Sequence, residues 1–185
     1  MASPLSPGFW VDPFFWAFLS MIGWASSISV VGNKILGKNT WFGIIVVALA
    51  EIPRLILPLD FIMQPRFGGS SLFLALGGLV LIIALIFGSP VFRIQPFTKP
   101  QKKEPLRTMS LYAVVRHPLY VCDILWPLGV ALLFRSVIGT VLTVVWFLVA
   151  AQLALFEEEQ LIEAYGDEYR AYQRKVKWRL IPYLF

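Results

Sequence analysis

The sequence predicts an all-α integral membrane protein with five transmembrane helices and a cytoplasmic C-terminal amphipathic helix. Of its 185 residues, 58% are hydrophobic and only 15% are charged, whereas soluble domains average about 45–50% and about 25%. The apolar residues gather in five stretches near the roughly 20 residues that cross a bilayer, and the basic residues lie between them. A soluble α/β enzyme, a disordered chain and a disulfide scaffold are therefore poorly supported.

The apolar stretches give the expected spans in order. Charged residues and prolines interrupt the second apolar stretch. Arg135 marks a tight turn between the fourth and fifth stretches. The residues after 156 are too charged to cross and predict a surface helix with a tail. We expect one membrane domain over 1–185, with spans at about 9–31, 41–63, 71–92, 119–134 and 136–156, and with cytoplasmic segments at 93–118 and 157–182.

The distribution of basic residues predicts the orientation. Thirteen of the 16 Lys and Arg residues fall in loops on one side of this arrangement, and only Arg66 and Arg135 fall on the other. The positive-inside rule places the richer side in the cytoplasm, so the N-terminus is expected outside and the C-terminus inside. The first eight residues contain no Lys or Arg, so we expect no cleavable signal peptide. The membrane is the cell membrane or the endoplasmic reticulum, depending on the source.

Two polar stretches flank the last helical pair at the expected cytoplasmic face. Arg116-His117-Pro118-Leu119-Tyr120 precedes the fourth span, and Glu157-Glu158-Glu159 follows the fifth. A helical hairpin would bring the basic and acidic stretches into one site. Taken singly, the basic stretch is also typical of an interfacial anchor. The acidic stretch is also typical of the solvated start of a helix.

These stretches resemble the integral-membrane methyltransferases related to isoprenylcysteine carboxyl methyltransferase and phosphatidylethanolamine N-methyltransferase. That superfamily has Arg-His-Pro-x-Tyr-x-Gly, a helical pair, Glu-Glu-x-x-Leu, an aromatic-Gly step and spaced tyrosines. The resemblance covers about 106–182, where Glu157-Glu158-Glu159-Gln160-Leu161 and Tyr165-Gly166 are followed by Tyr169 and Tyr172. The sequence departs from the pattern at Ser110 and Leu111, which replace Gly-Pro, and at Cys122, which replaces Gly.

The resemblance implies S-adenosylmethionine as the methyl donor and a lipophilic acceptor that enters from the bilayer. It places donor binding at Arg116, His117, Pro118, Tyr120, Glu157 and Glu158. A carboxylate would pair with the donor's ammonium, Arg116 or His117 would take its carboxylate or adenosine end, and Tyr120 would pack on the sulfonium or adenine. Arg116 and His117 are also the catalytic candidates. His117 is the single histidine, and we favour donor binding over a general-base role for it.

The acceptor stays open among a prenylcysteine carboxylate, a phospholipid amine and an isoprenoid. Charged residues within spans indicate function by default, and the candidates for the substrate cavity are Glu51, Arg54, Asp123 and Trp126. Glu51 and Arg54 are spaced to pair on one helix face, so a purely structural ion pair is an equal alternative. Cys122 is expected as a small buried residue, and as a lone cysteine it builds no cysteine-based metal site. We expect no metal.

Two other functions stay open. A nicotinamide-dependent sterol or steroid reductase has a similar C-terminal half, but Leu119 and Tyr169 replace its Asn and Trp. A non-catalytic membrane protein would retain the fold without donor binding. A nucleic-acid partner is not expected, since no binding motif accompanies the basic residues. The oligomeric state is not predicted.

Overall fold

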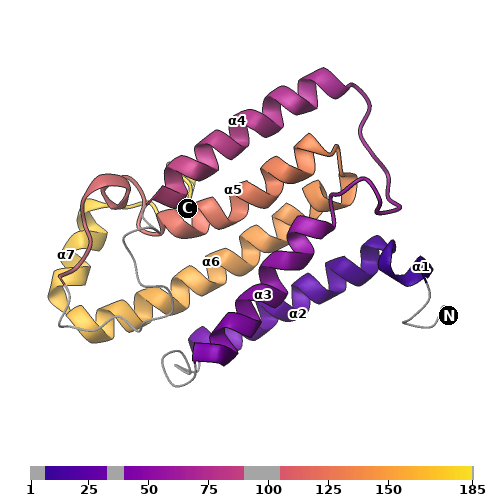
Figure 1. Ribbon diagram of the computed structural model, residues 1–185. Coiled ribbons are helices and arrows are strands. Elements are labelled where there is room, and N and C mark those ends of the chain that lie inside the picture. Colours follow the sequence, from indigo (N-terminus) through magenta and orange to yellow (C-terminus); the bar gives the residue numbers. More distant parts are fainter. Residues whose placement is uncertain (1–6, 33–39, 90–104, 185) are drawn as a thin grey trace.

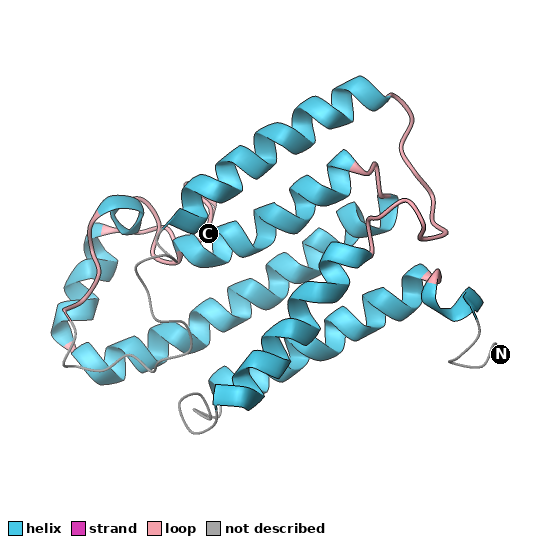
Figure 2. Ribbon diagram, viewed as in Figure 1, coloured by secondary structure: helices cyan, strands magenta, loops and turns pink. Residues whose placement is uncertain are grey.

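The computed structural model describes residues 7–32, 40–89 and 105–184. Regular structure in these ranges is helical, apart from one isolated antiparallel bridge between Arg66 and Ser136 (Figure 2). The predicted all-α class is therefore confirmed for the described residues. The elements in chain order are α1 (Pro7–Trp10), α2 (Pro13–Gly32), α3 (Thr40–Ile56), α4 (Ser70–Gly88), the 3₁₀ helix η2 (Ser110–Ala113), α5 (Pro118–Leu133), α6 (Val137–Tyr165) and α7 (Asp167–Lys175).

The long helices lie side by side, with α4 against α5, α2 against α3, and α6 against both α2 and α5 (Figure 1). Glycines permit two of these contacts. A Cβ atom on Gly23 of α2 would collide with the Ala50 backbone nitrogen of α3. A Cβ on Gly77 of α4 would lie 2.8 Å from the Leu133 nitrogen at the end of α5. Only glycine allows backbones to approach so closely.

The second predicted span, 41–63, is wrong at its end because α3 stops at Ile56. The helix contains Pro53, and its last hydrogen bond runs from the Leu57 backbone nitrogen to the Pro53 carbonyl at 2.9 Å. Pro58 follows and has no N–H to continue the ladder. The chain then turns, and the Arg66 guanidinium holds this turn by donating to the backbone carbonyls of Pro58, Leu59, Ile62 and Phe134.

The fifth predicted span, 136–156, is part of a longer helix. Residues 157–165 continue α6 without a break, so α6 has 29 residues and a length of about 43 Å at 1.5 Å per residue. The acidic stretch is therefore internal to α6 and does not start a helix. Gly166 ends α6 with a φ of 58° and a ψ of −124°, a conformation nearly restricted to glycine. The expected surface helix is then only the nine residues of α7.

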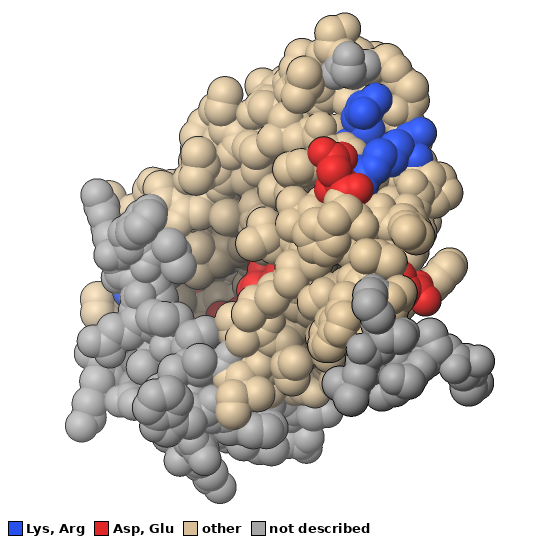
Figure 3. Space-filling model, turned by 45° about the vertical axis from the view of Figure 1, so that its right-hand side comes forward, with Lys and Arg blue, Asp and Glu red and all other residues tan. Residues whose placement is uncertain are grey.

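Two described helices, α4 and α6, are long and apolar enough to cross a membrane, and α5 is a shorter apolar helix. Only 11% of the most apolar window of α4 is buried inside the molecule, which leaves leucine and isoleucine side chains exposed along it. Figure 3 shows one face that is largely uncharged, with acidic atoms recessed in a hollow. The third span matches α4 to Gly88, while residues 90–92 and 93–104 lie outside the described residues.

Candidate active site

The chain before α5 is held by the C-terminal tail. After η2, the backbone nitrogen of Arg116 donates to the Trp178 carbonyl at 2.9 Å, and that of His117 donates to the Arg179 carbonyl at 3.0 Å. His117 is the N-cap of α5 and Pro118 is its first residue, where a proline ring suits the helix and its missing N–H costs nothing. The Arg-His-Pro motif is thereby fixed at one end of α5, against residues about 60 positions away in sequence.

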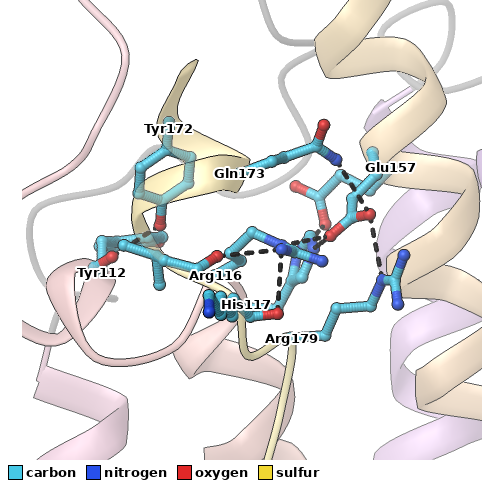
Figure 4. Close-up of polar contacts among 10 residues, drawn as sticks. Tyr112, Arg116, His117, Glu157, Tyr172, Gln173 and Arg179 are labelled. Atoms are coloured by element: carbon cyan, nitrogen blue, oxygen red, sulfur yellow. Dashed lines mark hydrogen bonds and ion pairs between the residues drawn. The ribbon is translucent and has the colours of Figure 1, made fainter. Parts of the chain in front are cut away.

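Glu158 of α6 is buried, and its polar partners include Arg116, Gln173 and Arg179, which Figure 4 labels. Its Oε1 accepts from Arg116 Nε at 2.6 Å and lies 3.3 Å from His117 Nε2. Its Oε2 accepts from Arg179 Nε at 3.0 Å and from Gln173 Nε2 at 3.3 Å. Arg116 also donates to the carbonyls of Val176 and Lys177 at 2.9 and 3.1 Å. Every oxygen of this carboxylate therefore has partners from outside its own helix.

Glu157 has a different environment, although it is the next residue. Its side chain is 37% exposed, against 5% for Glu158. Its Oε2 lies 3.4 Å from His117 Nδ1. The His117 and Tyr120 rings lie next to one another, with centroids 5.7 Å apart. Glu157, His117 and Tyr120 thus form a group that keeps one carboxylate accessible from outside.

The two carboxylates favour the protonated form of His117. Burial alone would lower the pKa of His117, but hydrogen bonds and negative charge from Glu157 and Glu158 outweigh it and raise this pKa above its ordinary value. Opposite charges at such distances favour the protonated ring. The His117 ring therefore lies between two carboxylates that favour its protonated form.

The tyrosines after Glu158 support this network. Tyr169 and Tyr172 of α7 and Val176 after it are buried together against Ile162 and Tyr165 of α6. The Tyr172 hydroxyl donates to the Tyr112 carbonyl of η2 at 2.6 Å. The spaced tyrosines therefore pack on the protein, and they connect α7 to the segment that presents Arg116.

A second polar group lies within the bundle and unites the four cavity candidates. The Arg54 side chain of α3 is fully buried and pairs with Glu51 on its own helix and with Asp123 of α5 at 2.7 Å. Three indole rings surround the guanidinium, with its central carbon 4.8, 5.5 and 5.4 Å from the ring centroids of Trp24, Trp126 and Trp146. The predicted pair of Glu51 and Arg54 is present, and Asp123 completes it across helices.

The structure shows the surroundings of the residues that depart from the family pattern, Ser110, Leu111 and Cys122. Cys122 is half-buried, and its sulfur packs against Gly88 of α4, where an added Cβ would lie 2.8 Å away. Ser110 and Leu111 begin η2, and Ser110 has a positive φ of 60°. A glycine suits that conformation better, so the serine carries some backbone strain.

Sequence reasoning missed two members of the Glu158 network. Gln173 and Arg179 belong to the C-terminal segment, where the sequence marks Arg179 only as one of several basic residues. A signal was available for Gln173, because it follows Tyr169 by four residues on the face of α7 that carries the tyrosines. Arg179 follows the end of α7, where helical spacing has no predictive value.

The Arg-His-Pro motif before α5 and the Glu-Glu motif within α6 both lie in a region that matches a known family. The model of the phospholipid methyltransferase family matches residues 67–168, which is more than half of the chain. The chain belongs to this family. Its matched region includes Arg116, His117, Glu157 and Glu158, and it excludes the tail that holds Gln173 and Arg179.

Individual members of known function are also similar. Protein-S-isoprenylcysteine O-methyltransferase of Schizosaccharomyces pombe is 33% identical over 106 residues, which cover 56% of this chain and 44% of that protein. Methanethiol S-methyltransferase of Crocosphaera subtropica is 36% identical over 123 residues, which cover 62% and 46%. A methanethiol S-methyltransferase of Bradyrhizobium diazoefficiens is 38% identical over 88 residues, which cover 46% and 28%.

This chain therefore matches less than half the length of these relatives. No solved structure matches it significantly.

Proposed function

We propose that this chain transfers a methyl group from S-adenosylmethionine to a lipophilic acceptor at the boundary between membrane and cytoplasm. The observation that carries the proposal is the convergence of Arg116, His117, Glu157 and Glu158 in one polar site at the end of apolar helices. Family membership supports methyl transfer. The relatives' names include an oxygen acceptor on an isoprenylcysteine and a thiol acceptor, and both classes are candidates here.

The chemistry of the donor fits the residues present. S-adenosylmethionine supplies a methyl group on a sulfonium, which leaves as a neutral thioether. Glu157 is suited to accept from the donor's ammonium because its carboxylate is partly exposed, and the Tyr120 ring is suited to pack near a cation. Glu158 and Arg116 are buried and already paired with each other, so their part is to hold Glu157 and His117 in place. Arg179, with 30% of its side chain exposed, is suited to meet the donor's carboxylate.

The proposal includes the orientation. In the predicted orientation the Glu158 network would face the cytoplasm, from which a polar donor arrives, and the acceptor would enter sideways from the bilayer. In this arrangement Pro118 starts α5 at the membrane surface. The site would thus lie where the aqueous and lipid phases meet, and helices satisfy their own backbone bonds there.

The test is calorimetric titration of the detergent-purified protein with S-adenosylmethionine, with NADPH as a parallel titrant. We expect donor binding in the wild type, at least tenfold weaker binding in Glu157→Gln, and no change in Glu168→Gln, an exposed acid of α7. Binding of NADPH in place of the donor would support the reductase alternative, which the family match does not favour. A folded protein that binds neither would be a non-catalytic member.

A further inference from the structure

The end of the chain forms a strap over residues 174–184, which begins in the last turn of α7 and reaches the start of α5 (Figure 1). Two backbone hydrogen bonds fix the strap there, because the nitrogens of Arg116 and His117 donate to the carbonyls of Trp178 and Arg179 at 2.9 and 3.0 Å. The position of the strap relative to α5 is therefore set by the fold at two successive residues.

Beyond Leu180, which is buried, the strap exposes large apolar side chains. Ile181, Tyr183 and Leu184 are 38%, 88% and 73% exposed. The Leu184 nitrogen donates to the Ile181 carbonyl at 3.2 Å and closes a turn, and the ring centroids of Trp178 and Tyr183 lie 5.2 Å apart. The turn therefore presents an apolar and aromatic surface that the described part of the chain leaves accessible.

Basic side chains accompany this surface. Arg174 and Lys175 lie in the last turn of α7, Lys177 follows the helix, and all three are exposed. The acidic residues of α7, Asp167 and Glu168, lie in its first turn, at the opposite end. The helix dipole favours such an order within α7, but it does not account for Lys177, which lies beyond the helix. The strap therefore combines positive charge with exposed apolar groups.

The strap ends where the proposed orientation places the membrane surface. In that orientation Pro118 starts α5 at this surface, and the bond from His117 to the Arg179 carbonyl holds the strap next to it. The apolar turn of residues 181–184 follows directly, so it lies at the level of the lipid headgroups. Tryptophan and tyrosine are enriched at membrane–water interfaces, and basic residues are enriched on the cytoplasmic side.

The composition of the strap favours a lipid surface over water and over a soluble partner. Single exposed apolar residues are common on soluble proteins, but here Ile181, Tyr183 and Leu184 are adjacent and lie beside cations. Headgroups of the bilayer that surrounds the protein are always within reach, whereas a soluble partner would have to displace them. Anionic headgroups also complement the charge of the strap.

We propose that the strap binds anionic lipid headgroups of the leaflet that surrounds the start of α5. Arg174, Lys175 and Lys177 meet the lipid phosphates, and Tyr183 and Leu184 enter the headgroup region. A basic residue at an anionic surface strengthens binding roughly fivefold, and this attraction falls off within about 10 Å. The inference goes beyond the proposed function, because it uses the proposed orientation of the chain but not methyl transfer.

Lipid contact has a consequence for the donor site, because the strap supplies part of that site. The Arg179 side chain pairs with Glu158 at 3.0 Å, and the carbonyls of Val176 and Lys177 accept from Arg116. A strap that moved away would remove these partners and the two backbone bonds together. Lipid that holds the strap against α5 therefore favours the arrangement that we propose for donor binding.

The first test observes the strap directly in the full chain. A Cys122→Ser, Leu184→Cys variant carries a polarity-sensitive dye and is placed in nanodiscs of phosphatidylcholine, with or without phosphatidylglycerol. We expect spin-labelled lipid to quench the dye at least twofold more strongly in the anionic discs. The same dye on Glu168→Cys, in the first turn of α7, should show no such difference.

Equal quenching at residue 184 in neutral and anionic discs would overturn the role of anionic headgroups. No quenching in either disc would overturn lipid binding altogether and would leave the surface to a soluble partner. Both readouts are independent of the methyl donor, which is absent from this experiment.

Charge variants assign the effect to the strap. Lys177→Gln removes a cation but retains the backbone carbonyl that accepts from Arg116, so we expect it to reduce the gain in quenching at least twofold. Adding Lys175→Gln should abolish the gain. Arg170→Gln is the matched control, since Arg170 is an exposed cation of α7 outside the strap that pairs with Asp167. A gain that persists in the double variant would overturn the part assigned to these lysines.

Calorimetric titration with S-adenosylmethionine in the same discs measures the coupling to the donor site. An anionic surface concentrates a cationic donor around any protein, so the comparison is between variants. We expect phosphatidylglycerol to tighten donor binding at least threefold more in the wild type than in the Lys175→Gln, Lys177→Gln variant. An equal gain in both would overturn the coupling. Failure of the donor to bind in any disc would instead overturn the proposed function, and the quenching would still decide the lipid contact.

Discussion

At the scale of single residues, adjacent glutamates on one helix have different tasks. Glu158 accepts from side chains of three other segments and is 4% exposed, whereas Glu157 keeps over a third of its side chain accessible. Successive residues on a helix point about 100° apart, so only one of them faces the tail at Arg179. The other faces Tyr120 of α5.

We therefore expect Glu158→Ala to lower the free energy of unfolding by about 3–5 kcal/mol, because it leaves the Arg116 guanidinium buried without its carboxylate. Glu157→Ala should change stability far less and mainly weaken donor binding. Thermal unfolding in detergent, followed by circular dichroism, checks the first expectation. A Glu158→Ala protein as stable as the wild type would show that the network contributes little.

The raised pKa of His117 predicts a pH dependence of stability. Its protonated ring is stabilised in the folded state by Glu157 and Glu158, so this contribution is complete below the unfolded value near 6.5. It is lost as pH rises through the raised folded value. The wild type should lose stability above about pH 6.5 more steeply than His117→Gln. The chain has one histidine, so NMR titration of its ring reports the folded pKa directly, and a value at or below the ordinary one would contradict the expectation.

At the scale of elements, close helix contacts place the site. α4 lies against α5 through Gly77, and its end at Gly88 accommodates Cys122. α5 carries Tyr120 and Asp123 toward α6 and α3. The spacing of α5 from its neighbours therefore depends on small residues in α4, which itself contributes none of the polar residues of the site.

Adjacent glycines of α4 give a matched test of this contact. Gly77→Ala would place a Cβ 2.8 Å from the Leu133 nitrogen and 2.9 Å from the Gly129 oxygen, whereas a Cβ on Gly78 meets nothing within 4 Å. Gly77→Ala should lower stability by about 1–3 kcal/mol, as overpacking does, and Gly78→Ala should be neutral or slightly stabilising. Thermal unfolding of the two variants compares them directly, and equal midpoints would argue against a close approach of α4 to α5 at Gly77.

At the scale of the whole molecule, the amphiphilic arrangement suggests how it sits in a bilayer. The most apolar window of α4 is only 11% buried by the protein, so lipid is its natural neighbour. α6 is about 43 Å long, more than the roughly 30 Å of a hydrocarbon core, so its last turns with Glu157 and Glu158 would extend beyond the lipid. In this arrangement the polar network would lie at one surface of the membrane.

Thiol labelling tests the predicted orientation. In a Cys122→Ser background, Asp60→Cys should react with a membrane-impermeant maleimide from outside intact cells, because residue 60 lies on the predicted external side. Arg170→Cys of α7 should react only after the membrane is permeabilised. Both positions are exposed, so burial would not account for a lack of reaction. The reverse pattern would invert the topology.

Composition and motifs alone were sufficient for the helical class, the family resemblance and most residues of the polar site. Hydrophobic stretches and the Arg-His-Pro and Glu-Glu pairs are local features of a chain, and Gly166 ends a helix by its own conformational freedom. These properties depend on neighbouring residues, so a sequence displays them. The ion pair between Glu51 and Arg54 could be predicted from the sequence for the same reason, because residues three apart on a helix lie on one face.

The tertiary structure decided what depends on distant segments. The C-terminal residues meet Glu158 only because the tyrosines of α7 pack against α6. No local sequence pattern marks Arg179 as a partner of Glu158. Asp123 joins Arg54 because α5 lies beside α3, and the tryptophans around them come from separate helices. Which of two adjacent carboxylates is buried likewise depends on what packs against each face of α6. Burial and pairing across helices are properties of the packed chain, so spacing along the sequence does not contain them.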